Sequence, residues 1–425
     1  MNQFFNTTAT RTTGQQSEHI TESFFNQLAD HPDSFDLRHA TYDEVRKSIN
    51  LLRSDCSTGY DNIPTKYIKP VSEYLISPLT HIINTCIEQS IFPDDWKISR
   101  ICPVPKVANP STLAEYRPIS ILPVLSKVFE RIILQQLTER IESKSIYLEM
   151  QSGFRKCHST TTLLLKLRDR IKQAMRKGEV TLAIFADFSK AFDTVNYKTL
   201  LSHLNNLGFS KHLLKLLSSY LSNRYQYVQV DDRVSKRLLV NFGVPQGSIL
   251  GPILFNLYVT SINTNGDSEY LLYADDTTLL RYSKVKDLPD TIKAMQAELN
   301  NINQWSIDNN LALNATKTKM TLFSTAQLSH FHNLSKFETV LTSNDQPLDR
   351  VEFFNILGVR FNQHLSWKDH INYVTKSCFA TLKSLNLFKR SASLPLRKTL
   401  AESIILSKLR YGNFLFGDLT KIELN

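Results

Sequence analysis

Two acidic segments, each at the end of an apolar run, most strongly constrain what this chain can fold into. Residues 183–186 lead into Asp187, and residues 270–274 lead into the pair Asp275 and Asp276. A short apolar run that stops at an aspartate is typical of a buried strand that carries a carboxylate out to a cleft. Adjacent aspartates between two apolar runs predict the tip of a hairpin. We expect this hairpin and the Asp187 strand to pair as central antiparallel strands.

Carboxylates that converge in this way predict a site for divalent metal ions. Like charges brought together need cations to neutralise them, and phosphoryl transfer uses two ions about 3.5–4 Å apart. We expect Asp187 and Asp275 to bridge the ions, with Asp276 nearby and the backbone carbonyl of Phe188 as a further ligand. Mg²⁺ prefers such oxygen ligands, and Mn²⁺ is the alternative ion. The competing interpretation is that the aspartates cap turns, but three of them beside apolar runs favour the metal site.

The composition narrows the class of partner. The chain has 425 residues and a formal net charge of +10, and 42% of its residues are hydrophobic. This length suggests about two or three domains, and this hydrophobic content is enough for large cores. The positive charge favours a polyanion such as nucleic acid, because neutralised phosphates release counterions. A generic basic protein is the alternative that charge alone leaves open.

Cysteine usage and hydrophobic patterning exclude several classes of protein. The five cysteines are scattered and form no Cys-x-x-Cys pair, so neither a disulfide scaffold nor a zinc ribbon is expected. No apolar run is long enough to cross a bilayer, and the polar first twenty residues lack the apolar core of a signal peptide. We therefore expect no membrane association and an intracellular protein, in the nucleus, the cytoplasm or both. Residues 1–18 are expected to be flexible.

Strand and helix patterns alternate between residues 180 and 325, which predicts an α+β fold of two packed layers. Helices should cover one face of the sheet and leave the other face for substrate. Prolines in the extended segment 98–106 favour an edge strand. The other expected elements are a helix opened by Pro123, helices around 200–221 and 292–305, strands at 225–230, 319–323 and 353–361, and a helical, basic stretch from residue 367 to the end.

Three longer motifs in a fixed order carry a family resemblance. They are residues 185–193, the glycine-containing segment 243–252, and Tyr273-Ala274-Asp275-Asp276. Together they resemble the catalytic motifs of reverse transcriptases from non-LTR (LINE-type) retrotransposons, the jockey-like group in particular. The similarity extends from about residue 40 to the end. Residues 59–61 and 92–97 favour this lineage over retroviral enzymes, whose chains lack the N-terminal extension.

The resemblance implies a right-hand polymerase with fingers, a palm whose antiparallel sheet is backed by helices, and a partial thumb. We expect a flexible lead-in over 1–40, the N-terminal extension and fingers over 41–178, the palm over 179–362, and a truncated thumb over 363–425. An upstream endonuclease, a Cys/His knuckle and a clear RNase H segment are not evident. Because the thumb is expected to be truncated, we expect a weak grip on primer and template, and low processivity.

The resemblance also assigns roles near the reacting groups. Phe192 matches the steric gate, whose ring would clash with a ribose 2′-hydroxyl, with an ordinary core phenylalanine as the alternative. Gln246 and Gly247 belong to a loop that approaches the base or sugar of the nascent pair, although the loop could also be a plain tight turn. Lys317 could protonate the pyrophosphate as a general acid. Asp193 is expected to cap the following helix.

Basic residues complete the expected site. Lys106 and Arg117 match residues of the fingers that neutralise the incoming triphosphate. Arg155 is a candidate for contact with nucleotide or template, and Arg224 and Gln226 match a further motif with a template role. For each of these basic residues taken alone, the alternative is a solvated surface charge without a binding role.

The expected function is RNA-directed DNA polymerisation, in which a dNTP is added to the 3′-hydroxyl of a DNA primer on an RNA template. Two other classes stay open. One is an RNA-dependent RNA polymerase, against which Phe192 and Ala274 argue. The other is a non-catalytic nucleic-acid-binding remnant of a decayed element. The sequence does not reveal which RNA is copied, what primes synthesis, or the oligomeric state.

Overall fold

The computed structural model divides into two compact units that interleave along the chain. It describes residues 1–16, 19–55, 57–146, 149–262, 266–337, 340–343, 346–389 and 391–416. The first unit comprises Met1–Glu149, Phe188–Asn263 and Gln304–Ala312, and the second comprises Met150–Asp187, Thr264–Asn303 and Leu313–Asn425. The expected fingers, palm and thumb are consecutive along the chain, so they do not correspond to these units and their boundaries stay predictions. Within the described residues, no helix is both long and apolar enough to traverse a bilayer.

A five-stranded sheet with the order β12-β9-β3-β8-β7 forms the centre of the second unit. β3 (Val180–Ala186) is buried along its whole length. It pairs antiparallel with β8 (Asp276–Ser283) on one side and with β9 (Lys319–Phe323) on the other. β7 (Glu269–Tyr273) pairs antiparallel with β8, and the short β12 (Asp349–Arg350) runs parallel to β9. The predicted hairpin and its central pairing with the Asp187 strand are therefore confirmed.

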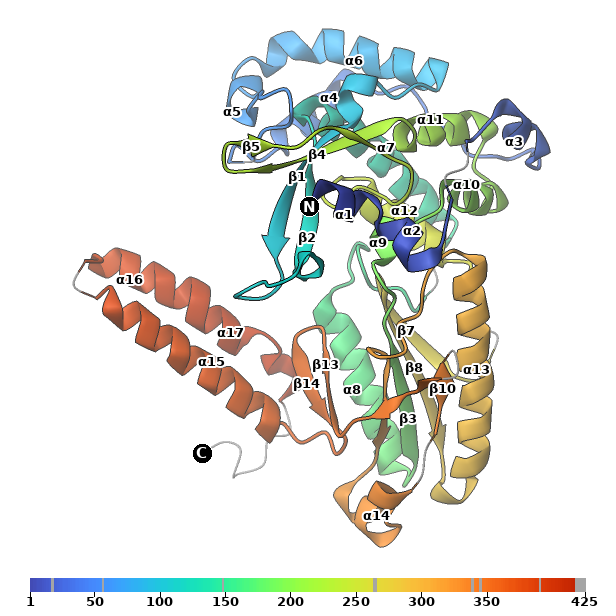
Figure 1. The fold of residues 1–425 in the computed structure, drawn as a ribbon, viewed down its shortest axis with the longest axis vertical. Helices are drawn as coiled ribbons and strands as arrows, with labels where there is room; N and C mark the ends of the chain where they lie inside the picture. Colours follow the sequence, from blue (N-terminus) through green and yellow to red (C-terminus); the bar gives the residue numbers. More distant parts are fainter. Residues whose placement is uncertain are drawn as a thin grey trace. The chain divides into compact units, whose positions relative to one another are not determined.

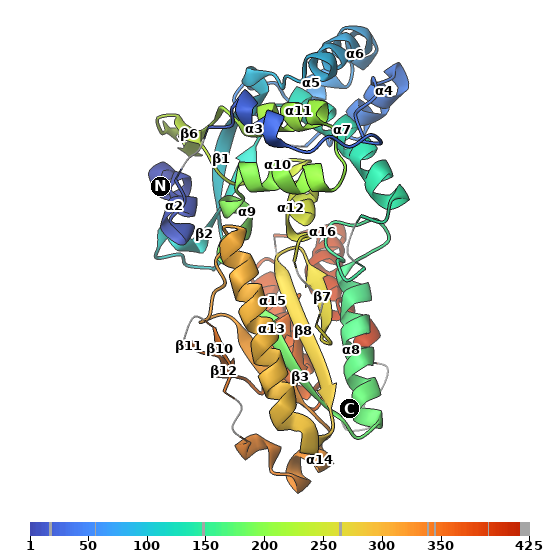
Figure 2. The same ribbon diagram turned by 90° about the vertical axis from the view of Figure 1, so that its right-hand side faces the viewer.

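Helices cover both faces of this sheet, so the expectation of one face left open for substrate is wrong (Figures 1 and 2). On one face, α8 (Thr160–Arg176) packs apolar side chains against Ala183 and Phe185 of β3. On the other face, Glu298 of α13 (Leu288–Asp308) accepts hydrogen bonds from Tyr270 and Arg281. The physical reason is that β3 is apolar on both faces, and such strands are buried from both sides.

A second hairpin packs beside α8 in the same unit. The segment expected as one strand over 353–361 is two strands, β13 (Phe353–Ile356) and β14 (Val359–Asn362), joined by a two-residue turn. Both turn residues, Leu357 and Gly358, have positive φ, which suits a tight hairpin. The hairpin buries its apolar side chains in the same core as α8.

The predicted helical stretch after residue 367 is confirmed for most of the described C-terminal residues. The remaining elements of the second unit are η3 (Val285–Asp287), α14 (Ala326–Phe331), η4 (Leu334–Lys336), β10 (Thr342–Ser343), β11 (Gln346–Pro347), α15 (Lys368–Leu387), α16 (Leu394–Leu400), the π-helical turn η5 (Ala401–Leu406), α17 (Ser407–Arg410) and η6 (Asn413–Leu415).

The first unit contains its own sheet, with the order β2-β1-β4-β5 and with β6 also paired to β4. β1 (Ile98–Pro105) lies between β2 (Tyr116–Ile121) and β4 (Arg224–Val230), so the expectation of an edge strand is wrong. The prolines explain the partial pairing. Only residues 98–101 pair with β4, whereas Pro103 and Pro105 lie beyond that ladder and need no donor on that side.

Helices surround this sheet. α7 (Val124–Ser143) begins directly after Pro123, as predicted. The helical stretch expected around 200–221 is two helices, because Gly208 adopts a positive φ between them. The other elements of the unit are α3 (Glu22–Gln27), α4 (Tyr42–Asn50), α5 (Thr65–Ile68), α6 (Ser72–Gln89), η1 (Asp94–Lys97), η2 (Leu113–Glu115), α9 (Ala191–Thr194), α10 (Tyr197–Asn206), α11 (Lys211–Leu221), β5 (Arg233–Val234), β6 (Leu238–Val240) and α12 (Gly251–Val259).

The start of the chain is folded where we expected a flexible lead-in. α1 (Asn2–Asn6) and α2 (Thr8–Thr13) are helical. Phe5 is 7% exposed and packs with Ile101 and Val228 of the sheet. The amide of Gln15 donates to the carbonyl of Thr194 at 2.9 Å. The polar, Thr-rich composition did not predict these contacts. One buried phenylalanine and a few amide contacts are enough to hold a short segment.

Candidate active site

The three predicted carboxylates gather at one end of the sheet in the second unit. The last registered pair of β3 and β8 is Ala186 with Thr277, so Asp187 and Asp276 lie next to this pair at the same end of adjacent strands. The pKa of Asp276 is raised to about 6 by partial loss of hydration and by the negative charges of Asp275 and Asp187, although the residue is exposed. Three carboxylates that repel one another form a strongly electronegative site.

The donor set of this site suits a hard divalent cation. Carboxylate oxygens are the ligands that Mg²⁺ prefers, and the charges of Asp275 and Asp187 add to the loss of hydration that raises the pKa of Asp276. Among the described residues, no group of three or more His, Cys, Asp or Glu side chains already surrounds a common point as metal ligands would.

The loop that precedes β9, at the same end of the sheet, holds the backbone of Asp187. The N–H of Asn314 donates to the carbonyl of Asp187 at 2.8 Å, and the N–H of Asp187 donates to Oγ1 of Thr318 at 3.3 Å. Nζ of Lys317 lies 3.4 Å from Oδ2 of Asp187, with both side chains partly exposed. The predicted Lys317 thus reaches the carboxylate cluster. Thr318 is a supporting residue to which the sequence assigned no role, although residues 314–318 match an Asn-x-x-Lys-Thr motif of the family and Thr318 is its last residue.

The residues near the predicted steric gate form a connected group in the first unit. The ring of Phe192 stacks on Phe255 of α12, with ring centroids 4.2 Å apart. Asp193 accepts a hydrogen bond of 2.6 Å from the amide of Gln246, and burial raises its pKa. The expectation that Asp193 caps the following helix is wrong, because the side chain of Asn196 caps α10.

The glycine loop after β6 fits tightly against neighbouring backbone. A Cβ on Gly243 would lie 2.8 Å from the carbonyl oxygens of Phe192 and Asp193, and one on Gly247 would lie 2.6 Å from the carbonyl oxygen of Ser120. Both glycines have positive φ. The loop is therefore closely packed on two sides, and its glycines permit that approach.

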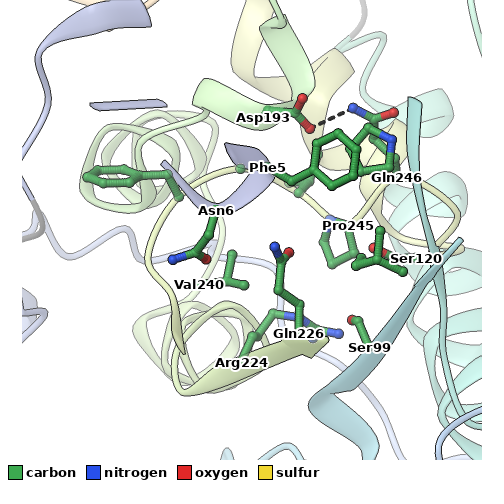
Figure 3. A pocket seen from close by; sticks show the side chains of 15 residues that line it. Phe5, Asn6, Ser99, Ser120, Asp193, Arg224, Gln226, Val240, Pro245 and Gln246 are labelled. Carbon is green, nitrogen blue, oxygen red and sulfur yellow. Dashed lines mark hydrogen bonds between the residues drawn. The ribbon is translucent and has the colours of Figure 1, made fainter. Parts of the chain in front are cut away.

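Gln246 lines a pocket in the first unit together with residues of the sheet (Figure 3). Arg224 and Gln226, which we expected as template contacts, also line it, but both are buried. Arg224 donates to the carbonyl of Tyr220 at 2.8 Å, and Gln226 donates to Asn2 of α1 at 3.0 Å. Contact of either side chain with a template would first require displacement of these partners.

The remaining predicted residues are distributed over both units. Lys106 and Arg117 are exposed in the first unit, and the positive charge of Lys106 partly offsets the raised pKa of Asp193. The ring of Phe188 is buried against Trp305, at a centroid distance of 6.0 Å. Arg155 is partly buried in the second unit.

Comparisons with known proteins identify the family. The sequence model of the family described as reverse transcriptase (RNA-dependent DNA polymerase) matches residues 104–373. Over 404 residues the chain is 29% identical to a probable RNA-directed DNA polymerase from transposon BS of Drosophila melanogaster, covering 92% of the chain and 44% of that protein. It is 28% identical, with 92% and 43% covered, to the RNA-directed DNA polymerase from mobile element jockey of the same species.

A third relative is a probable RNA-directed DNA polymerase from transposon X-element of Drosophila melanogaster, 26% identical over 88% of this chain and 41% of that protein. The resemblance to non-LTR, jockey-like elements is therefore confirmed. The chain spans less than half the length of these relatives.

Proposed function

Because the chain belongs to the reverse transcriptase (RNA-dependent DNA polymerase) family, we propose that it extends the 3′-hydroxyl of a DNA primer with dNTPs, using RNA as the template. The observation that carries this proposal is the convergence of Asp187, Asp275 and Asp276 at one end of the sheet, where partial loss of hydration and the charges of Asp275 and Asp187 raise the pKa of Asp276 to about 6. This sheet is the proposed palm. The sheet of the first unit would contribute to the fingers, and the C-terminal helices to the thumb.

The carboxylates would hold the divalent cations that the family uses. Asp187 and Asp275 would hold two Mg²⁺ ions, with Asp276 nearby and the carbonyl of Phe188 as a further ligand. When bound, such ions lower the pKa of the attacking hydroxyl and neutralise the leaving phosphates. Mn²⁺ offers a similar charge and oxygen preference.

Lys317 is the proposed general acid for the leaving pyrophosphate. Its side chain is 65% exposed, and its ammonium group reaches Asp187 at 3.4 Å. An exposed lysine can reorient towards a phosphate without breaking buried contacts, because its four-carbon stem is flexible. The position of Lys317 beside the carboxylates therefore supports a role in proton donation.

Further predicted residues would select and hold the nucleotide. Phe192 would exclude the 2′-hydroxyl, and its stacking on Phe255 would keep the ring in place. Gln246 and Gly247 would contact the base or sugar of the nascent pair. The exposed Lys106 and Arg117 would neutralise the triphosphate. Arg155 is the candidate for a further contact with nucleotide or template.

Primer extension on an RNA template with Mg²⁺ tests the proposal, with wild type compared to Asp275→Asn. We expect incorporation to fall by about 10²–10³-fold, because a neutral amide holds divalent cations more weakly than a carboxylate, in line with losses seen when catalytic electrostatics are removed. Asp290→Asn is the matched control, since Asp290 is an exposed aspartate of α13 in the same unit. Equal incorporation by wild type and Asp275→Asn would defeat the assignment.

Two further measurements separate the alternative functions. Phe192→Val should raise ribonucleotide use, and an unchanged nucleotide preference would reduce Phe192 to a packing residue. Competition between dNTPs and NTPs on the wild type distinguishes reverse transcription from RNA-dependent RNA synthesis. Retained binding of an RNA–DNA duplex without incorporation would support the non-catalytic remnant instead.

A further inference from the structure

Residues 150–153, which belong to none of the numbered strands, run alongside the hairpin that bears Asp275. The N–H of Leu272 in β7 donates to the carbonyl of Met150 at 2.9 Å, and the N–H of Ser152 donates to the carbonyl of Leu272 at 2.8 Å. Gln151 and Leu272 form a parallel bridge. The segment 150–153 therefore extends the sheet beside the edge strand β7.

The side chain of Gln151 reaches from this segment into the turn of the hairpin. Gln151 is 2% exposed. Its Oε1 accepts hydrogen bonds from the N–H of Gly153 at 2.8 Å and from the N–H of Ala274 at 3.1 Å. Ala274 is 7% exposed, so water has little access to its N–H. Gln151 thus satisfies a backbone donor that would otherwise be costly to bury.

Ala274, directly before Asp275, has an unusual backbone conformation. Tyr273 pairs with Asp276, which leaves Ala274 and Asp275 as a two-residue turn. Ala274 has a φ of 56°, a left-handed conformation that is unfavourable for a residue with a Cβ. Such a conformation persists only where its surroundings impose it. The backbone of Ala274 leads directly into Asp275, so a change at Ala274 would redirect that carboxylate.

The segment 150–153 approaches the turn at Ala274 closely because residue 153 is glycine. A Cβ on Gly153 would lie 2.3 Å from the backbone nitrogen of Ala274 and 3.0 Å from the carbonyl carbon of Tyr273. The obstructing atoms are backbone, which cannot move aside as a flexible side chain could. Any residue larger than glycine would push the turn away from the segment.

We propose that Gln151 and Gly153 are positioning residues for the reaction, because they hold Ala274 in the left-handed form that directs Asp275 towards the other carboxylates. We call Gln151 and Gly153 together the clamp. Without the clamp, mutual repulsion would separate the carboxylates and weaken their binding of divalent ions. The inference rests on the proposed function for its catalytic readout. Its effect on cation binding can be measured independently of activity.

The test compares the wild type with Gln151→Met, which keeps the volume of the side chain but removes the acceptor, and with Gly153→Ala. Primer extension is measured over a range of Mg²⁺ and dNTP concentrations. We expect kcat to fall by about 10–100-fold, as for other residues that orient metal ligands. The Mg²⁺ concentration for half-maximal rate should rise, whereas the KM for dNTP should stay within about threefold, because the nucleotide contacts are not removed. Ser152→Ala is the control within the same segment.

Calorimetric titration with Mg²⁺, together with thermal unfolding, separates positioning from a merely structural role. Weaker Mg²⁺ uptake by folded Gln151→Met or Gly153→Ala supports the clamp. Wild-type Mg²⁺ affinity in folded protein of both variants would overturn it, even if their melting temperatures fell. If the wild type bound Mg²⁺ but extended no primer, the proposed function would fail. The calorimetry would still test whether Gln151 and Gly153 position the carboxylates for Mg²⁺ binding.

Repeating the Gln151→Met substitution in a variant that carries Ala274→Gly tests whether the clamp acts through the conformation of Ala274. Glycine adopts positive φ at little cost, so Ala274→Gly should make the turn less dependent on Gln151. We expect the loss of Mg²⁺ affinity caused by Gln151→Met to be smaller with Gly at this position than with Ala. An equal loss in both backgrounds, compared as a double-mutant cycle, would contradict a role through the conformation of Ala274.

Discussion

Glu130 in the first unit and the aspartates at the end of β3 and β8 place the same chemical group in opposite settings. Glu130 is fully buried and accepts hydrogen bonds from the N–H groups of Ile249 and Leu250, at 2.8 and 3.2 Å, before helix α12. The hydroxyls of Ser126 and Tyr220 donate to it as well. The positive end of the helix dipole adds to these donors.

The aspartates of the second unit have the reverse surroundings. Asp276 faces the charges of Asp275 and Asp187, and these raise its pKa together with partial loss of hydration. A carboxylate surrounded by donors stabilises the fold, whereas carboxylates gathered together destabilise it until a cation binds. The difference teaches that burial and donor count, rather than residue type, separate a structural carboxylate from a candidate catalytic one.

The largest expected effect on stability comes from Glu130→Ala. We expect a loss of about 3–5 kcal/mol in the free energy of unfolding, because buried N–H groups lose a charged acceptor. Chemical denaturation followed by circular dichroism measures it. Glu139→Ala is the matched control on the same helix, since Glu139 is exposed, and it should change stability by less than about 0.5 kcal/mol. Similar losses from both substitutions would remove the contrast drawn here.

Glu44 adds a third kind of setting for a carboxylate, and its contribution to stability should depend on pH. Hydrogen bonds from Arg38 are the largest of the causes that lower its pKa from 4.5 to about 2. The folded-state pKa is below the unfolded value, so the stabilisation is present above pH 4.5 and is lost as the pH falls towards 2. Glu44→Gln should cost about 1–2 kcal/mol at pH 7, with allowance for solvent screening of Arg38. The difference between variant and wild type should shrink by pH 3, and a constant difference would contradict the assignment.

Asp276→Asn should have the smallest effect and the opposite sign. Without divalent ions, we expect the melting temperature to rise by about 1–3 °C, because one of three repelling charges is removed. Addition of Mg²⁺ should stabilise the wild type more than the variant, since the variant has lost a ligand. A melting temperature lowered by this substitution in the absence of metal would indicate that Asp276 has a structural partner like that of Glu130.

Local patterns in the sequence were enough to predict the part of the molecule that carries the aspartates. The apolar runs before Asp187 and Asp275 predicted the strands, the hairpin and their pairing, because a buried strand needs a continuous apolar stretch and a hairpin needs a polar tip. The same patterns failed at the N-terminus, where Phe5 anchors a polar segment by a contact with Ile101, far away in the chain.

Supporting residues of the candidate site were harder to predict. Gln151 and Thr318 each hold the backbone of an aspartate-bearing segment through a side-chain oxygen. A glutamine or threonine that accepts such a bond has the same local sequence pattern as one that faces solvent. Glu130 likewise lies within an apolar helix stripe, and nothing in the sequence indicates the donors that surround it.

The sequence by itself determined which segments form the strands beside the aspartates, where carboxylates leave them, and to which family the chain belongs, because these depend on short-range periodicity and on motifs in fixed order. The tertiary structure alone decided which carboxylates are satisfied and which repel, and which distant residues hold Ala274 and Asp187 in place. Hydration, hydrogen bonding and charge interaction depend on neighbours in space, and folding brings those neighbours from remote parts of the chain.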